Sequence, residues 1–146
     1  ANVPSNPTLL QRNVEFLEYG LKEGIPLIAP DGAYWYDSAR KNVFDLCRAK
    51  NKPTAIICPG ITFSYGAWLG TAEAGVRIPD DLSFIGFDAD VTTNPYMTSL
   101  EQPIDQIAAK AIELLRSMRV AGKHLKQRVY EFDAQLCERG SCRKIN

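Results

Sequence analysis

Histidine is almost absent from this sequence, and cysteine is scarce. The 146 residues include one histidine, His124, and four cysteines. Four residues separate Cys137 from Cys142, and with a single histidine this pair does not make the ligand set of a tetrahedral zinc site. We therefore expect neither a metal nor a cofactor. So few cysteines also argue against a disulfide framework and favour reduced thiols in a cytoplasmic protein.

Net charge is absent as well, because 17 lysines and arginines balance 17 aspartates and glutamates. A protein that holds the phosphate backbone needs a basic footprint, so the chain by itself is not expected to bind DNA. No apolar run reaches the ~18 residues that cross a bilayer, and no charged start precedes an apolar leader. We therefore expect no membrane partner.

Apolar periodicity instead predicts helices that alternate with short strands. The strands are apolar throughout rather than at every second residue, which is typical of a parallel sheet covered by helices. The expected fold is therefore α/β. The expected helices cover about 7–23, 38–50, 62–73 and 103–122, and the expected strands are Ile25–Ala29, Thr54–Cys58, Leu82–Phe87 and, with one wet face, Gln127–Phe132.

The order of these elements indicates an incomplete fold. A parallel sheet needs a strand before its first helix, whereas this sequence starts with a helix. Three parallel strands also leave the edges of the sheet uncovered. We interpret the chain as a fragment with a lobe over 1–102 that lacks its first strand, a helix over 103–122, and C-terminal strands and a tail over 123–146.

Candidate binding residues follow the expected strands. Ligands bind open parallel sheets at the carboxyl ends of the strands. Those ends carry Tyr34 and Trp35, then Gly60-Ile61, then Asp88. A carboxylate that accepts hydrogen bonds, beside aromatic faces, suits polyhydroxylated rings or flat heterocycles. The alternative is that Asp88 caps a turn and the aromatic residues only cover the sheet.

Signatures of catalysis are missing. The sequence has no glycine-rich nucleotide loop, and Ser64 lacks the first glycine of a nucleophile elbow. Any triad would depend on His124, which lies in a basic turn where we expect it to be solvated. We therefore expect a protein that is not an enzyme. Tyr65, Trp68 and Leu69 recur at one helical turn, as in a core or in a patch that faces a partner.

Four segments together resemble one known family. They are PTAIIC at 53–58, GVRIPDDLSFIGFD at 75–88, TSLEQP at 98–103 and ERGS at 138–141. This pattern is similar to the effector-binding part of lactose-repressor (LacI/GalR) type transcription regulators, over about residues 12–142.

The resemblance implies a three-layer, periplasmic-binding-protein-like (type I) lobe. In that family a helix-turn-helix domain, which this chain lacks, binds operator DNA and is followed by two α/β lobes. A sugar-like or nucleobase-like effector lies between the lobes and alters the fit of the homodimer to its operator. This chain would be mostly the C-terminal lobe, and the helix from Pro103 would cross toward the other lobe.

The resemblance also implies roles for single residues. The ligand-binding positions it implies are Asp88, Tyr34, Gln102, Ile104, Thr8 and Gly60. The implied dimer interface comprises Tyr65, Trp68, Leu69 and Tyr96.

Two departures from the family pattern affect the ligand. Gly60-Ile61 stands where many members carry Asn-Asp, and no arginine lies between Asn2 and Leu10. Since isoleucine cannot replace a buried hydrogen-bond partner, a typical sugar fits less well. The alternative is that Ile61 simply packs against its neighbours. Two alternatives to the regulator stay open: a periplasmic-type sugar-binding protein of the same fold, and a dimerisation module that holds no ligand.

Overall fold

A computed structural model describes residues 7–25, 35–89, 92, 94–121 and 129–144, with side chains from residue 11 on and none at 120 and 121. Four strands form one sheet in the order β1-β2-β3-β4, with β1, β2 and β3 parallel and β4 antiparallel to β3. The strands are β1 (Ala55–Ile57), β2 (Ser83–Phe87), β3 (Thr98–Glu101) and β4 (Gln135–Cys137). The helices are α1 (Pro7–Lys22), α2 (Tyr36–Arg48), α3 (Ile61–Glu73) and α4 (Ile104–Ala121).

The parallel α/β architecture predicted from the apolar runs is confirmed. Two of the expected strands correspond to β1 and β2, whereas the expected strand at 25–29 lies outside the described residues. The prediction of a strand at 127–132 was wrong for its described part, because 129–132 form none and β4 begins at Gln135. Strand β4 is held by its hydrogen bonds to β3 and not by the burial of an apolar face, since Leu136 pairs with Leu100 and is nevertheless exposed.

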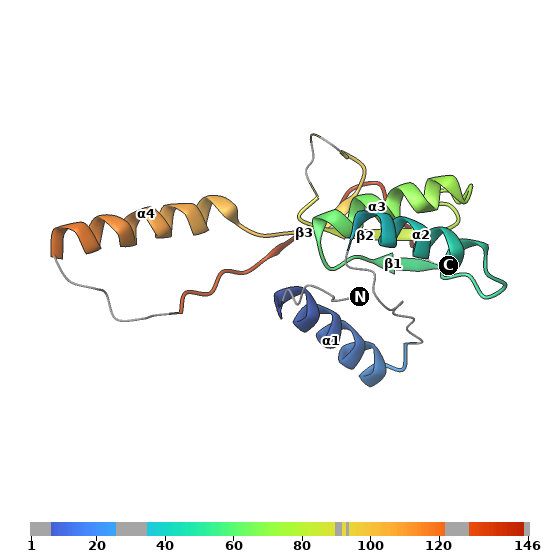
Figure 1. Cartoon of the computed structure of the whole chain (residues 1–146), viewed down its shortest axis with the longest axis horizontal. Coiled ribbons are helices and arrows are strands. Elements are labelled where there is room, and N and C mark those ends of the chain that lie inside the picture. Colours follow the sequence, from blue (N-terminus) through green and yellow to red (C-terminus); the bar gives the residue numbers. More distant parts are fainter. Residues whose placement is uncertain (1–6, 26–34, 90–91, 93, 122–128, 145–146) are drawn as a thin grey trace.

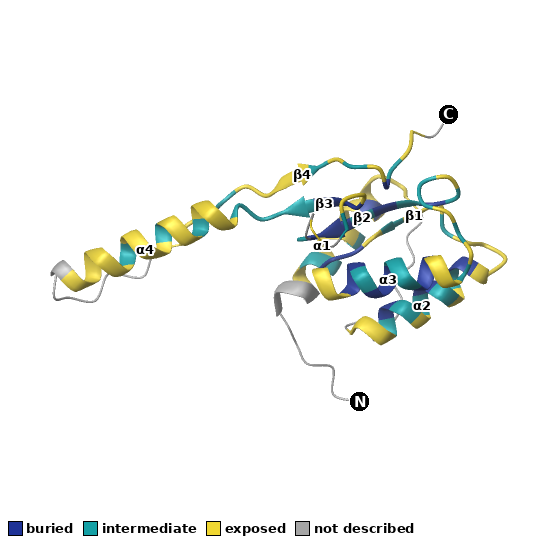
Figure 2. Cartoon of the chain, turned by 90° about the horizontal axis from the view of Figure 1, so that it is seen from above, coloured by how far each residue is buried: buried dark blue, intermediate teal, exposed yellow. Residues whose placement is uncertain are grey.

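Helices α2 and α3 pack against each other through glycines, and α3 contacts β2 of the sheet. A Cβ atom at Gly66 would overlap the carbonyl oxygen of Tyr36, and one at Gly70 would overlap that of Arg40. The missing side chains let the two helix backbones approach one another closely. Figure 2 shows the two helices side by side, with buried residues along their contact and toward the sheet.

The core lies between α3 and the sheet. Phe84 of β2 and Met97 have no solvent exposure, and the half-buried Trp68 of α3 meets Phe84 edge-on, with ring centroids 5.2 Å apart. Burying such large side chains is the main force that holds α3 on β2.

A segment near the end of the described chain completes the sheet. Ser141 lies between β2 and β3 where these strands separate. Its carbonyl oxygen accepts the Phe84 N–H at 2.8 Å, and its hydroxyl accepts the Thr98 N–H at 2.7 Å and donates to the Phe84 carbonyl at 2.6 Å. Every polar group that the separation would leave unpaired at this point is therefore satisfied.

Helix α4 projects away from the rest of the fold (Figure 1), as residues 104–121 extend from the ends of β3 and β4. At its base, Arg139 is a clamp: its guanidinium donates to the Met97 carbonyl at 2.7 Å and to Glu101 at 2.5 Å. Along α4 several large apolar side chains are exposed, among them Ile112 and Leu115. Within the described residues, no helix is both long and apolar enough to cross a membrane.

Candidate functional site

Asp88 stands at the carboxyl end of β2, in the middle of the sheet. Its backbone is in the left-handed region at φ 52°, which is uncommon for residues other than glycine and is better tolerated by aspartate than by most. Its N–H donates to the Leu100 carbonyl at 2.9 Å and so extends the pairing of β2 with β3. This conformation turns the side chain toward the residue that follows β3.

Gln102 holds both oxygens of the Asp88 carboxylate. The Gln102 backbone N–H donates to Oδ1 at 3.0 Å and its side-chain Nε2 donates to Oδ2 at 2.5 Å, in a half-buried setting. Hydrogen bonds to a carboxylate are stronger than those between neutral groups. The structure thus brings these two predicted ligand-binding residues together. Among the described residues, the partner of this carboxylate lies just beyond the end of the neighbouring strand β3.

Arg12 of α1 reaches the same end of the sheet. Its guanidinium donates to the Pro59 carbonyl at 3.0 Å, just beyond β1, and lies 3.7 Å from the centroid of the Phe87 ring. A cation over an aromatic face is favourable, most of all where water is partly excluded. The sequence pattern did not reveal this residue, because the family pattern places an arginine between Asn2 and Leu10, and Arg12 lies two positions beyond that segment.

The end of β1 supplies backbone and apolar surface rather than polar side chains. Pro59 and Gly60 are buried, and Gly60 precedes α3 as its N-cap without a side-chain hydrogen bond. Ile61, the first residue of α3, is 42% exposed. Ser64 ties this turn to β2, since its hydroxyl donates to the Gly60 carbonyl and accepts the Phe87 N–H.

Cys58 is buried directly before this turn. Burial raises the pKa of its thiol to about 12, against a smaller opposing effect of the hydrogen bond with Ser64. A thiol that stays protonated at neutral pH is a poor nucleophile, because the thiolate is the reactive form. Cys58 therefore contributes packing to the site.

The other predicted ligand-binding residues are placed unevenly. Ile104, the first residue of α4, is 60% exposed and stands two positions beyond Gln102. Thr8 belongs to α1, but its side chain is outside the described part of the chain, and Tyr34 lies outside the described residues altogether. The described part of the site is therefore an anion at β2, a cation near β1 and an apolar residue at the start of α3.

The residues predicted to form a dimer interface differ in exposure. Tyr65, Trp68 and Leu69 of α3 are half-buried, and the edge contact with Phe84 assigns part of Trp68 to the core. Tyr96 is 70% exposed. At these positions a partner could contact Tyr96 and the exposed parts of the three half-buried side chains of α3.

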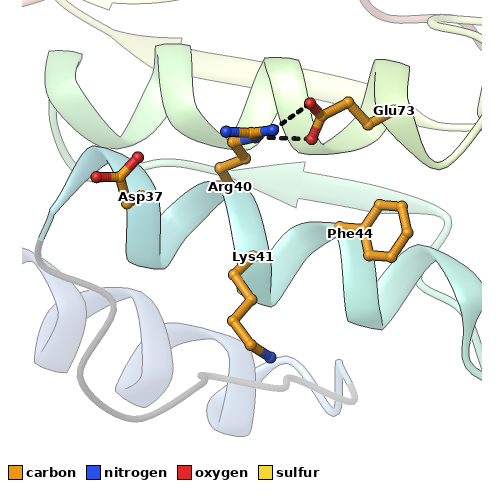
Figure 3. A pocket seen from close by; sticks show the side chains of 5 residues that line it. All are labelled: Asp37, Arg40, Lys41, Phe44 and Glu73. Carbon is orange, nitrogen blue, oxygen red and sulfur yellow. Dashed lines mark hydrogen bonds and ion pairs between the residues drawn. The ribbon is translucent and has the colours of Figure 1, made fainter.

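A separate hollow of about 270 Å³ lies on the outer side of α2 and α3 (Figure 3). Arg40 crosses it and binds Glu73 through two hydrogen bonds, which lowers the pKa of Glu73. Glu73 ends α3, whereas Ile61 at the other end of the same helix borders the candidate site. A 13-residue helix is ~20 Å long, so this hollow is not part of that site.

Comparison with known proteins places this geometry in a family. The family of periplasmic binding protein-like domains matches residues 7–142. The HTH-type transcriptional repressor PurR of Photobacterium profundum is 33% identical over 120 residues, which make up 80% of this chain and 35% of that protein. The HTH-type transcriptional repressor CytR of Escherichia coli is 31% identical over 117 residues, or 78% and 34% of the two chains.

Solved structures agree with these sequence matches. A LacI-type transcription regulator from Bifidobacterium animalis subsp. lactis has a TM-score of 0.72 and 28% identity, with 88% of this chain and 48% of that chain covered. A LacI-family regulatory protein from Chloroflexus aggregans has a TM-score of 0.68 and 28% identity, with 87% and 48% covered. The chain spans about a third of the curated relatives it matches and about half of these solved chains. It belongs to the family of periplasmic binding protein-like domains, and it is similar to parts of LacI-type regulators.

Proposed function

We propose that this chain is the effector-binding and dimerisation part of a cytoplasmic transcription regulator that responds to a small molecule without catalysing its conversion. The observation that carries the proposal is the Asp88 carboxylate, which Gln102 holds in a fixed orientation at the carboxyl end of β2. A preset acceptor at this end of a parallel sheet is suited to the hydroxyl or N–H groups of a ligand.

The regulator would work by a shift between two arrangements of its lobes. Operator DNA is bound by a helix-turn-helix domain outside this chain, and a homodimer presents two such domains. An effector that binds better to one angle between the lobes shifts the population toward that angle and so changes operator affinity. The PurR and CytR relatives, which are repressors by name, support this role.

A second lobe would account for the exposed apolar side chains of α4. Ile112 and Leu115 are more than half exposed although apolar, and α4 extends away from the sheet (Figure 1). Burying such side chains is favourable by about 1.5–3 kcal/mol each, so a covering surface is expected. We assign α4 to the face that packs on the other lobe.

The effector's chemistry follows from the two sides of the site. Asp88 accepts hydrogen bonds, whereas Ile61 presents apolar surface where a polar side chain would serve a hydroxyl group. An unpaired hydroxyl against Ile61 is unfavourable. These residues support a ligand with a donor-bearing edge and an apolar or flat face, such as a nucleobase-like ring, over a bare sugar.

The test uses the whole regulator that contains this chain and an operator selected from random DNA. Operator affinity is measured by fluorescence anisotropy with and without each of a panel of sugars and nucleobases. We expect at least one compound to change operator affinity. Asp88→Asn should raise the concentration needed by about tenfold or more, because hydrogen bonds to charged groups are worth ~1.5–3 kcal/mol.

Operator affinity without effector should be the same for Asp88→Asn and the unaltered protein. Asp80→Asn provides the matched control, since it makes the same change in charge at an exposed residue before the other end of β2. An unchanged response of Asp88→Asn to the effector would reject the site, and no response to any effector by the unaltered protein would count against the proposed function.

A further inference from the structure

Gln102 occupies a junction between the candidate site and α4. It is the first residue after β3, and only Pro103 separates it from Ile104, where α4 begins. The Gln102 carbonyl accepts the Ile104 N–H at 2.8 Å, and the Pro103 carbonyl accepts the N–H groups of Gln106 and Ile107. The direction in which α4 leaves the sheet is therefore set within a few residues of the Asp88 carboxylate.

The contacts of Gln102 point toward Asp88 rather than toward a ligand. Its backbone N–H and its side-chain NH2 group both donate to the one carboxylate. Among the described side chains of α4, the other hydrogen bonds stay within that helix, from Lys110 to Glu113 and from Ser117 to the Glu113 carbonyl, while the Lys110 ammonium also lies 5.1 Å from the centroid of the Tyr130 ring. Besides the Arg139–Glu101 clamp and the β3–β4 pairing, the Asp88–Gln102 pair fastens the start of α4 to the rest of the lobe.

We propose that Gln102 is a positioning residue that couples Asp88 to the direction of α4, an inference that rests on the proposed effector-binding function. Each carboxylate oxygen has further lone pairs, so a ligand donor at Asp88 shares the oxygens with Gln102. A ligand that donates a hydrogen bond to Oδ2 weakens the bond from the Gln102 Nε2 to the same oxygen. The direction of the segment from Gln102 to α4 then changes. Occupancy of the site is thereby linked to the lobe that α4 contacts.

The first arm of the test needs no effector and uses the 146-residue chain. Gln102→Met keeps the length of the side chain and removes the Nε2 donor. Amide hydrogen exchange by NMR should then be about tenfold faster at residue 102, as expected when a bond to a charged group is lost. The Cys58 amide, which donates to the Ile85 carbonyl inside the sheet, should change less than twofold.

Gln106→Met is the matched control, since Gln106 is exposed on the first turns of α4. It should leave exchange at residue 102 unchanged. Equal acceleration at residue 102 and Cys58 would indicate general destabilisation and overturn the proposal, as would no change at residue 102. Asp88→Gly, which suits the positive φ, should reproduce the local effect from the other side of the pair; if it does not fold, Gln102→Met alone decides.

The second arm separates positioning from ligand contact in the whole regulator. A positioning residue should mainly lower the maximal change in operator affinity that saturating effector produces, by about threefold or more. A direct ligand contact would instead shift the effector concentration at half response and leave the maximum intact, and that result would overturn the proposal. If the regulator shows no effector response at all, the proposed function is wrong. The exchange measurements need no effector and therefore still test the link between Asp88 and Gln102.

Discussion

Cys58 illustrates how a single buried side chain contributes a pH dependence to the stability of the fold. Its thiol pKa is raised by burial from an ordinary value of 9.0 to about 12. Between these values the unfolded chain loses this proton and the folded chain retains it. The stabilising effect of the neutral thiol is therefore complete below pH 9 and is lost as the pH rises toward 12.

We predict that the difference in unfolding free energy between the unaltered chain and Cys58→Ala shrinks as the pH rises above 9. The expected slope is about 1.4 kcal/mol per pH unit, because one proton is involved. Urea unfolding at pH 8, 9, 10 and 10.5 measures it, and the contribution of other titrating groups cancels in the difference. A difference that stays constant across this range would contradict the burial of the thiol.

At the residue scale, sequence reasoning found Asp88 and Gln102 but not the bond between them. Asp88 was identifiable because an aspartate directly follows a fully apolar strand and because the surrounding segment resembles a known family. Their hydrogen bonds depend on the pairing of β2 with β3, which no local pattern encodes. Arg12 lies beyond the Asn2–Leu10 segment in which the family pattern places an arginine, and its acceptor at Pro59 is 47 residues away, so no local pattern reveals this contact either.

The pair of helices α2 and α3 depends on the absence of side chains at their contact. Gly70→Ala should therefore destabilise the chain by about 1–3 kcal/mol, as overpacking does, since the new methyl group meets the Arg40 carbonyl. Helix propensity alone would favour alanine by about 1 kcal/mol. The sign of the change, measured by urea unfolding, thus separates the two effects.

Thr62→Ala serves as the control for this substitution, because Thr62 is an exposed residue of the same helix. It should alter the free energy of unfolding by less than about 0.5 kcal/mol. A stabilised Gly70→Ala variant would mean that α2 lies farther from α3 than described.

At the scale of elements, the apolar runs predicted β1 and β2, and helical periodicity predicted all four helices within a few residues. Periodicity was insufficient for β3 and β4, which are short and carry polar residues such as Ser99 and Gln135. Buried Ser99 uses its hydroxyl to accept the Ala89 N–H, so its place in the sheet is fixed by a partner rather than by hydrophobicity. The alternation of polar and apolar residues at 127–132 was misleading, because an apolar residue such as Val129 is exposed and not buried against the sheet.

For the whole molecule, the proposed second lobe makes α4 sensitive to context. Leu115 is 66% exposed. Leu115→Lys should change the unfolding free energy of this chain by less than about 0.5 kcal/mol, as surface substitutions usually do. In the longer regulator the same substitution should destabilise by about 1.5–3 kcal/mol, since the side chain would then be buried. Equal losses in both proteins would mean that α4 packs on this lobe instead.

A lobe on its own also offers a ligand only part of its contacts. We predict that calorimetric titration of this chain with sugars and nucleobases yields no heat of binding at micromolar concentrations, because the proposed second lobe would supply the other half of the enclosing surface and without it the ligand stays hydrated. The whole regulator, titrated with the compound that alters its operator affinity, is the positive control. Micromolar binding by this chain alone would contradict a site shared between two lobes.

Ser141, wedged between β2 and β3, has a consequence for how the polypeptide is made. It bonds to Phe84, 57 residues earlier, and the ribosome synthesises all of α4 in the interval. During translation, the backbone groups of Phe84 and Thr98 that pair with Ser141 stay without this partner until residue 141 is made. Contacts so distant in sequence also form slowly. Maturation of this lobe is therefore bound to the order of synthesis, and nascent chains halted before residue 141 should be the preferred targets of proteases and chaperones.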